Sequence, residues 1–253
     1  MQHFDEYQKF LKANAKQNDL YYRKSAITKT EQQKFLEKLL SNNKHFSGKL
    51  EIADIACGGG GGSLSYWLSK KNALSNFTLV DYLEDAISIS KEINRENSDR
   101  FSFYVGNIYD LKIDKKFDFV FCWQALMCLD RAEKALNELI DITKDGGFIY
   151  ISSLFNVDFD VDIYSRCLDH TTPAGRENVY CNYNTYSLKT ISNWLENKVS
   201  HFKVHKFDTN VDFDYKGRGL GTFCEKILKN KSVQRIQISG GMLMNWGILE
   251  IQK

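Results

Sequence analysis

The sequence predicts an α/β fold: a seven-stranded, mostly parallel sheet with helices on both faces and antiparallel strands near the C-terminus. Short apolar runs, rich in β-branched and aromatic residues, alternate with segments whose apolar residues recur every three or four positions. The first run, residues 51–55, is followed by five consecutive glycines, Gly58 to Gly62, and then by helical spacing. Alternation of this kind forms parallel sheets that bind ligands at the carboxyl ends of their strands.

The length and charge of the chain indicate a single domain that is not expected to bind nucleic acid or membranes. At 253 residues the chain can bury one substantial core, so we expect a single domain over residues 1–253. Lys and Arg total 34 against 32 for Asp and Glu, a balance that does not favour nucleic acid as a partner. The start has no basic segment followed by an apolar run, and no stretch approaches about 18 apolar residues. We therefore expect a soluble, cytoplasmic protein that does not bind membranes.

The N-terminal residues 1–45 are expected to form a helical cap. Residues 2–17 carry apolar side chains at spacings of three and four, which predicts an amphipathic surface helix. A second helix is predicted from Thr30, as its cap, to Asn42. Between them, Tyr22 could fold over the mouth of a ligand site or simply pack against the domain.

Residues 46–153 contain the repeated strand and helix pattern and are the expected cofactor-binding half. After the first strand, helical spacing begins with Leu64 and Trp67, and later helices follow the second and fourth strands. The further strands of this half are predicted at residues 76–80, 101–105, 117–122 and 147–153.

Residues 154–253 are expected to hold a substrate insertion and the C-terminal strands. The segment 154–187 is rich in aromatic and polar residues but lacks periodicity, and its position after the fifth strand suits a roof over the site. A helix is predicted over 188–197, followed by an antiparallel meander that could belong to the roof or to a homodimer contact. Its strands are predicted at 201–207, 223–228, 234–238 and 246–251, with a hairpin turn at 229–231.

No metal site is expected. The six cysteines show no C-x-x-C pair, and two of them follow or lie in buried strands, so we interpret them as reduced core thiols. Cys167 and His170 are three residues apart, but no second pair completes a metal-binding set.

The glycine run favours one ligand class over another. Glycines lack a Cβ, so the turn can adopt positive φ and bring a ligand against bare backbone. For a dinucleotide, the third glycine of G-x-G-x-x-G would fall at Ser63. The alternative pattern, an acid followed by two residues and then Cys-Gly-x-Gly, matches residues 54–60. With Asp81 closing the second strand about 20 residues after the glycines, the chain resembles the Rossmann-like class I S-adenosylmethionine-dependent methyltransferases over residues 30–153.

The resemblance implies S-adenosylmethionine as cofactor and S-adenosylhomocysteine as product, and it implies roles for particular residues. Asp81 corresponds to the acid that accepts both ribose hydroxyls, although it could equally be a cap for the following helix. Asn107 and Ile108 lie where the family contacts adenine, and Cys122 lies where it meets the methionine part. Ala56 departs from the usual glycine. The expected cofactor-binding residues are Asp54, Ala56, Cys57, Gly58, Gly60, Asp81, Tyr82, Asn107, Ile108, Cys122 and Tyr22.

The acceptor is expected to be a small molecule. Family members that methylate nucleic-acid bases usually carry Pro-Pro and an aromatic after the fourth strand, where this chain has Cys-Trp-Gln-Ala-Leu. Residues 235–246 resemble methyltransferases of bacterial surface-polysaccharide synthesis, which implies O-methylation of a sugar or phosphate-type group such as a phosphoramidate. In the insertion, His170 is the candidate general base because its ordinary pKa is about 6.5. The other candidates are Tyr164, Tyr183 and Tyr186, to orient the acceptor, and Arg176, to bind an anionic group.

Two alternatives remain open at this stage. One is an NAD(P)-dependent oxidoreductase, because the same turn can hold a dinucleotide. The other is a catalytically inactive Rossmann-like domain that binds a partner through its tyrosine-rich insertion.

Overall fold

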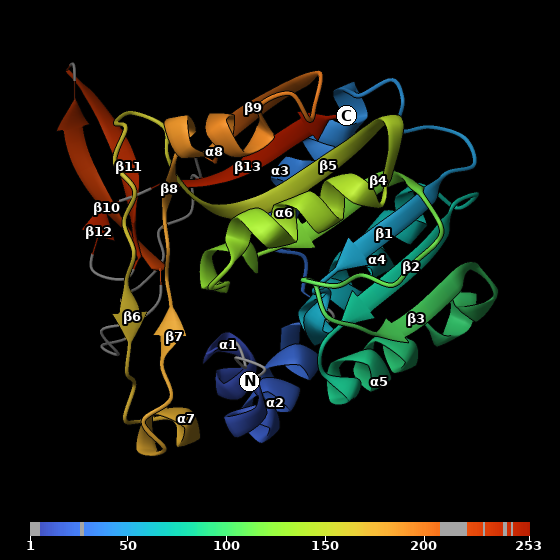
Figure 1. Ribbon diagram of the computed structural model, residues 1–253, viewed down its shortest axis with the longest axis horizontal. Helices are drawn as coiled ribbons and strands as arrows, with labels where there is room; N and C mark the ends of the chain where they lie inside the picture. The colour runs from blue at the N-terminus through green and yellow to red at the C-terminus, as the bar shows by residue number, and fades with distance from the viewer. Residues whose placement is uncertain (1–5, 26–27, 208–221, 230, 240–241, 244) are drawn as a thin grey trace.

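The computed structural model describes residues 6–25, 28–207, 222–229, 231–239, 242–243 and 245–253. Its central sheet runs β3-β2-β1-β4-β5-β13-β9 (Figure 1), and the two-residue strand β8 (Tyr186–Ser187) adds beside β5. Strands β1 to β5 pair in parallel, whereas β13 is antiparallel to both β5 and β9. The predicted fold class is therefore confirmed. The seven strands are β1 (Glu51–Ile55), β2 (Asn76–Asp81), β3 (Phe101–Val105), β4 (Phe117–Trp123), β5 (Thr143–Asn156), β9 (His201–Lys206) and β13 (Asn245–Gln252).

The sheet is buried on both faces because its strands carry apolar residues at consecutive positions. In β4, Val120 and Cys122 belong to one core, while Phe119 and Phe121 belong to the core on the opposite face. Figure 1 shows α6 in front of the sheet and α3 behind it. The helices that cover one face are α3 (Glu31–Asn42), α4 (Gly58–Lys71) and α5 (Glu84–Ile93), and those on the other are α6 (Ala132–Asp141) and α8 (Leu188–Leu195).

The N-terminal segment forms two helices where the sequence predicts one over residues 2–17, of which 1–5 lie outside the described residues. Helix α1 (Glu6–Ala13) packs against α7 (Pro173–Arg176) and β7 (Cys181–Asn182), and α2 (Ala15–Ser25) packs against α4 and α5. Asn14 separates them, and its buried side-chain oxygen accepts a hydrogen bond from the Ala174 amide at 3.1 Å. This contact with a distant element is invisible in local periodicity.

The start of α3 agrees with expectation, whereas the start of the cofactor-binding half differs from it in detail. The predicted cap of α3 is confirmed, since Thr30 and Gln33 form a capping box. The glycine run, however, is not a turn: α4 begins at Gly58 and includes all five glycines. The chain reverses in a shorter stretch, where Ala56 has φ 55° and Gly58 has φ 50°. Two short 3-10 helices complete this half, η1 (Arg95–Arg100) and η2 (Leu126–Cys128).

The C-terminal strands do not form the single meander that the sequence suggests. β9 and β13 pair with each other inside the central sheet, because Ile248, Leu249 and Ile251 of β13 are buried on both faces. The hairpin between them forms a separate sheet of β10 (Thr222–Lys229), β11 (Ser232–Ser239) and β12 (Met242–Leu243), with exposed Leu228 and Val233. Within the insertion, β6 (Arg166–Cys167) pairs antiparallel with β7.

Candidate active site

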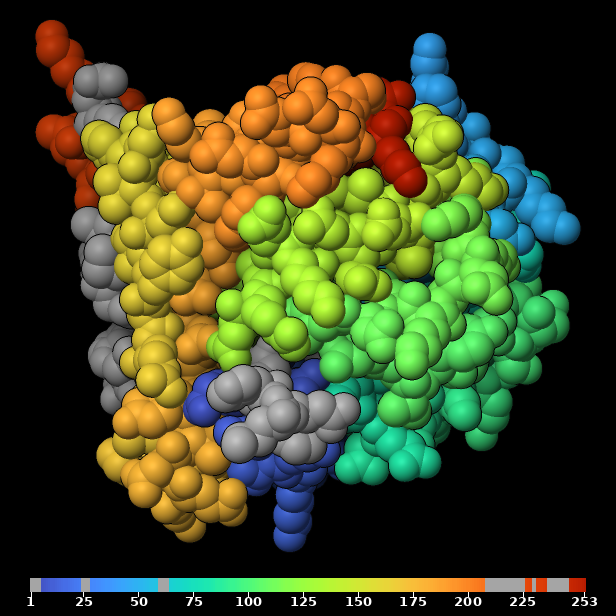
Figure 2. Space-filling model, in the orientation of Figure 1, coloured from blue at the N-terminus to red at the C-terminus, as the bar shows by residue number. Residues whose placement is uncertain are grey.

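A cavity of about 920 Å³ lies between the carboxyl ends of β1, β2 and β4 and the N-terminal helices. The N-terminal residues, blue in the space-filling view, lie between α7 and its flanking segments on one side and α5 on the other (Figure 2). We call two groups of its lining residues the strand-end half and the aromatic half. The strand-end half comprises Ile55, Ala56, Cys57, Gly58, Val80, Asp81, Tyr82, Gly106, Ile108, Tyr109, Trp123, Gln124 and Ala125. The aromatic half comprises Tyr7, Phe10, Met127, Cys128, Cys181, Tyr183 and Trp246.

Asp81 holds the strand-end half together. Its carboxylate accepts hydrogen bonds from the amides of Gly58, at 2.7 Å, and Leu83, at 2.9 Å, one on each oxygen. It therefore caps the start of α5, the alternative role considered for this residue, and it also binds the first amide of α4. Burial raises its pKa despite these bonds. Each carboxylate oxygen has two lone pairs, so both retain capacity for one further donor from a ligand.

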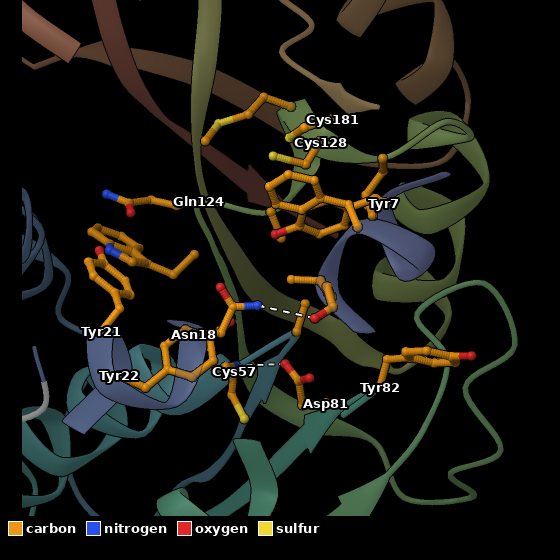
Figure 3. A pocket seen from close by; sticks show the side chains of 18 of the residues that line it. Tyr7, Asn18, Tyr21, Tyr22, Cys57, Asp81, Tyr82, Gln124, Cys128 and Cys181 are labelled. Carbon is orange, nitrogen blue, oxygen red and sulfur yellow. Dashed lines mark hydrogen bonds between the residues drawn. The ribbon is translucent and has the colours of Figure 1, made fainter. Parts of the chain in front are cut away.

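The Tyr22 ring lies over the backbone that joins β1 to α4. A Cβ placed on Gly58 would lie 3.3 Å from the Tyr22 ring, so this glycine allows the ring to cover the turn. Figure 3 shows Tyr22, Cys57 and Asp81 grouped at this end of the cavity. Burial is the main cause that raises the pKa of Tyr22, which keeps it a neutral phenol.

Asp54 lies behind this lining and does not reach the cavity surface. It is 1% exposed, and one carboxyl oxygen accepts a hydrogen bond from the Ser65 hydroxyl at 2.7 Å. Its other oxygen is buried without a hydrogen-bond partner. Burial, reinforced by the charge of Asp81, raises the pKa of Asp54 to about 8. Gly60 lies in the first turns of α4.

The ends of β3 and β4 supply the rest of this half. Ile108 and Tyr109 line the cavity, whereas Asn107 does not and uses its side-chain oxygen to accept the Tyr109 amide at 3.0 Å. After β4, Trp123 and Gln124 line the cavity, but Cys122 is fully buried in the core. Of the residues expected here, Ala56, Cys57, Gly58, Asp81, Tyr82, Ile108 and Tyr22 line the cavity.

The aromatic half joins segments that are far apart in the chain. Met127, Cys128, Cys181 and Trp246 are buried together, with Tyr7, Phe10 and Tyr183 packed against them. Figure 3 shows Tyr7, Cys128 and Cys181 at the end of the cavity opposite Tyr22 and Asp81. Burial is the main cause that raises the pKa of both Tyr7 and Tyr183, so their hydroxyls stay neutral.

The other candidates from the insertion lie outside the cavity lining. His170 and Arg176 are exposed, and Tyr164 is 67% exposed. Tyr186 is buried in the core, where its hydroxyl accepts the Asn184 amide at 3.3 Å. Of these candidates, the structure brings only Tyr183 to the cavity.

Sequence reasoning missed most of the aromatic half. The helical spacing of Tyr7 and Phe10 predicts a buried face, but not that this face covers a ligand site. Trp246 lies in a strand whose neighbours could not be derived from local pattern. No signal in the sequence pairs Cys181 with Cys128, since only the folded insertion brings them together.

The cysteines agree with the expectation of reduced thiols. Cys57, Cys122, Cys128, Cys167 and Cys181 are free of disulfides, and the side chain of Cys224 lies outside the described residues. Among the described residues, no group of three or more His, Cys, Asp or Glu side chains is placed to hold a metal ion. None of the described helices has the length and apolarity required to span a membrane.

A family model described as a methyltransferase domain matches residues 46–210, which is more than half of the chain. The chain belongs to this methyltransferase family. This membership confirms the predicted enzyme class and its cofactor, S-adenosylmethionine, and it rules against the oxidoreductase alternative.

The individual relatives are distant. A ubiquinone biosynthesis O-methyltransferase of Rickettsia akari is 28% identical over 120 residues, 47% of this chain and 46% of that protein. The chain thus spans about half the length of the curated relatives it matches.

Solved structures share the fold. The magnesium protoporphyrin IX methyltransferase of Synechocystis PCC 6803, solved with bound S-adenosylmethionine, has a TM-score of 0.50 and 12% identity, covering 88% of this chain and 80% of that one. The cyclase SpnF has a TM-score of 0.56 and 14% identity, covering 86% and 80%. Because the second is described as a cyclase, the fold alone does not establish methyl transfer.

Proposed function

We propose that this chain transfers the methyl group of S-adenosylmethionine to a hydroxyl oxygen of a small molecule bound in the cavity. The observation that carries the proposal is the continuity of one cavity from Asp81 and Gly58 to Tyr183 and Trp246. A donor held at the strand ends and an acceptor held against the aromatic half would share one enclosed space. The O-methyltransferase relatives support the choice of oxygen as the methylated atom.

The strand-end half suits the donor. The remaining lone pairs of Asp81 would accept the two ribose hydroxyls. Ile108 offers an apolar wall for adenine, and the Tyr22 ring, which lies over Gly58, offers an aromatic surface to the donor. When bound, S-adenosylmethionine supplies an electrophilic methyl group on sulfur. The contribution of the protein is to hold the acceptor oxygen in line with that methyl, which can lower the barrier by about 7–11 kcal/mol.

The resemblance of residues 235–246 suggests a sugar or a phosphate-type group as the acceptor. The cavity lining favours such an acceptor less than an uncharged one. Lys29 is the one cation among the described residues of the lining, and it forms an ion pair with Glu37 at 2.6 Å. A phosphate would therefore find no uncommitted cation in the described lining. His170, the base considered for a sugar hydroxyl, is exposed outside the cavity.

Donor binding and turnover test the proposal. Calorimetry should detect binding of S-adenosylmethionine, and Asp81→Asn should weaken it about ten- to a hundredfold because charged acceptors make the stronger hydrogen bonds. The control Asp110→Asn changes an exposed carboxylate outside the lining and should leave affinity unchanged. Methyl-labelled donor should then label a small molecule from a panel of hydroxylated acceptors.

Two results would contradict the proposal. Unchanged donor affinity in Asp81→Asn would remove the assigned role of the strand-end half. Tight donor binding without methyl transfer to any member of the panel would favour the inactive binding domain instead.

A further inference from the structure

We propose that the acceptor is an uncharged aromatic alcohol, a phenol, held in the aromatic half of the cavity. This inference rests on the proposed function and specifies its substrate class. It draws on three properties of the described lining: its aromatic and sulfur surface, its lack of uncommitted cations, and its lack of histidine.

The surface of the aromatic half suits a flat apolar ring. Four aromatic side chains, Tyr7, Phe10, Tyr183 and Trp246, lie there with the sulfur atoms of Met127, Cys128 and Cys181. The rings of Tyr7 and Phe10 are nearly parallel, with an interplanar angle of 13° and centroids 6.3 Å apart. Aromatic rings and polarisable sulfur both attract aromatic ligands beyond simple area burial.

Charge in the lining disfavours an anionic acceptor. The acids that line the cavity are Glu31, Asp81 and Asp169, against the single cation Lys29, which is committed to Glu37. Lys29 also lies over the Trp67 ring, 4.8 Å from its centroid, and Trp67 is outside the lining. A carboxylate or phosphate on the acceptor would therefore be desolvated without an uncommitted cationic side chain in the described lining.

The acid–base chemistry of the lining distinguishes a phenol from a sugar. Among the described residues that line the cavity there is no histidine, and the buried tyrosines hold their protons tightly. An aliphatic hydroxyl ionises with a pKa near that of water, about 15.7, and so needs a strong base. A phenol ionises with a pKa of about 10, so its oxygen becomes nucleophilic far more readily.

The step balances without a further reactant. The phenolic oxygen forms a bond to the methyl carbon while the carbon–sulfur bond of the donor breaks and sulfur keeps the electron pair. The phenolic proton passes to water. The products are an aryl methyl ether, S-adenosylhomocysteine and a proton.

Matched probes separate ring recognition from charge. Calorimetry on the protein saturated with S-adenosylhomocysteine would compare methyl caffeate with caffeate, which share the ring and hydroxyls but carry a neutral methyl ester and a carboxylate, respectively. We expect methyl caffeate to bind at least about tenfold more tightly, and glucose and glucose phosphate to bind more weakly than either. Equal or tighter binding of caffeate, or of either sugar, would overturn the inference.

Variants of one ring test where the probe binds. Tyr183→Leu removes an aromatic wall and should weaken methyl caffeate binding about three- to tenfold, whereas Tyr183→Phe keeps the ring and should bind almost normally. Binding of S-adenosylhomocysteine serves as the folding control for both. No loss in Tyr183→Leu would refute the placement in the aromatic half.

Methyl-transfer assays distinguish a wrong acceptor class from a chain that transfers no methyl group. If labelled methyl reaches glucose phosphate but not methyl caffeate, methyl transfer stands and the phenol inference falls. If the donor binds but no acceptor is methylated, the proposed function itself falls.

Discussion

The two halves of the cavity differ in how their residues are distributed along the chain. The strand-end half comes from four short stretches, each at the end of a consecutive parallel strand, from Ile55 to Ala125. The aromatic half joins α1, η2, β7 and β13, so that Tyr7 and Trp246 contribute to one cluster from opposite ends of the sequence. The first half follows from the alternating strand-and-helix architecture, whereas the second depends on segments outside that pattern, which are the N-terminal helix, the insertion after β5 and the C-terminal strand.

This difference has a physical consequence. Strand-end residues are fixed by the ladder of the sheet, and Asp81 is held by two backbone amides. The aromatic half depends on short elements, such as the two-residue strands β6 and β7 and the four-residue helix α7. Perturbing these short elements should alter acceptor binding while leaving donor binding intact.

The largest expected effect comes from Gly175→Ala in α7. A Cβ there would lie 1.9 Å from the Asp169 carbonyl oxygen and 2.7 Å from the His170 amide nitrogen, so the backbone must move. The turn from Asp169 to Thr172, both cavity-lining residues, would be displaced. We expect a loss of about 3 kcal/mol in unfolding free energy by denaturant titration. We also expect weaker acceptor binding, with donor affinity nearly unchanged.

Gly146→Ala is the matched control for this variant. Gly146 has φ +76° and open space around its Cβ position, so only the cost of a left-handed backbone applies, about 1–2 kcal/mol. If both variants lose the same stability, the close packing of α7 on its preceding turn is not what holds the aromatic half.

Much of the strand-end half could be predicted from the sequence, because each of its residues lies close to a strand that is recognisable from local sequence alone. Apolar runs of five to seven residues identified β1 to β4, and the spacing from the glycines located Asp81. The residue ranges of β9 and β13 could be predicted but not their places in the sheet, because β13 pairs with the distant strand β5 on one side and with β9 on the other. His170 illustrates the limit: its side-chain type suits catalysis, but the turn before α7 leaves it exposed.

The next largest effect is a pH dependence of stability through Asp54. Its pKa is about 8 in the folded protein because of burial and the neighbouring charge of Asp81, against about 4 when unfolded. Between these values the unfolded carboxyl is ionised while the folded one stays protonated, so stability falls as pH rises from about 4 to about 8. We expect a decline of about 2 kcal/mol from this group between pH 6 and pH 8.

The variant Asp54→Asn tests whether Asp54 causes this pH dependence of stability. Asparagine keeps the acceptor for the Ser65 hydroxyl but cannot ionise, so thermal unfolding of the variant should depend less on pH across this window. Asp81, whose pKa is also raised by burial, would account for part of the remaining slope. A variant with the slope of the unmodified chain would show that Asp54 is ionised in the folded protein.

A smaller effect, on the affinity for S-adenosylmethionine, is expected from changing Tyr22 of α2, which lies against the strand-end half. Tyr22→Leu should weaken S-adenosylmethionine binding about three- to tenfold, because the ring that covers Gly58 is lost while the helix remains. Tyr104→Leu changes a tyrosine that is 51% exposed on the edge strand β3 and should leave donor affinity unchanged. Equal donor affinity in both variants would mean that the strand-end half binds its ligand without help from α2.

The smallest effect is expected from a substitution of Ala56, and it should raise the free energy of unfolding rather than lower it. Its φ of 55° lies in the left-handed region, which costs an L-residue with a Cβ about 1–2 kcal/mol relative to glycine. Glycine is less ordered when unfolded, which offsets about 0.4–1 kcal/mol of that relief. Ala56→Gly should therefore stabilise the protein by about 0.5–1 kcal/mol in denaturant unfolding, whereas Ala53→Gly, in the buried strand β1, should destabilise it. A destabilised Ala56→Gly would mean that the methyl group of Ala56 contributes more by packing at the turn than its backbone strain costs. In that case the strand-end half would depend on side-chain packing as much as the aromatic half does.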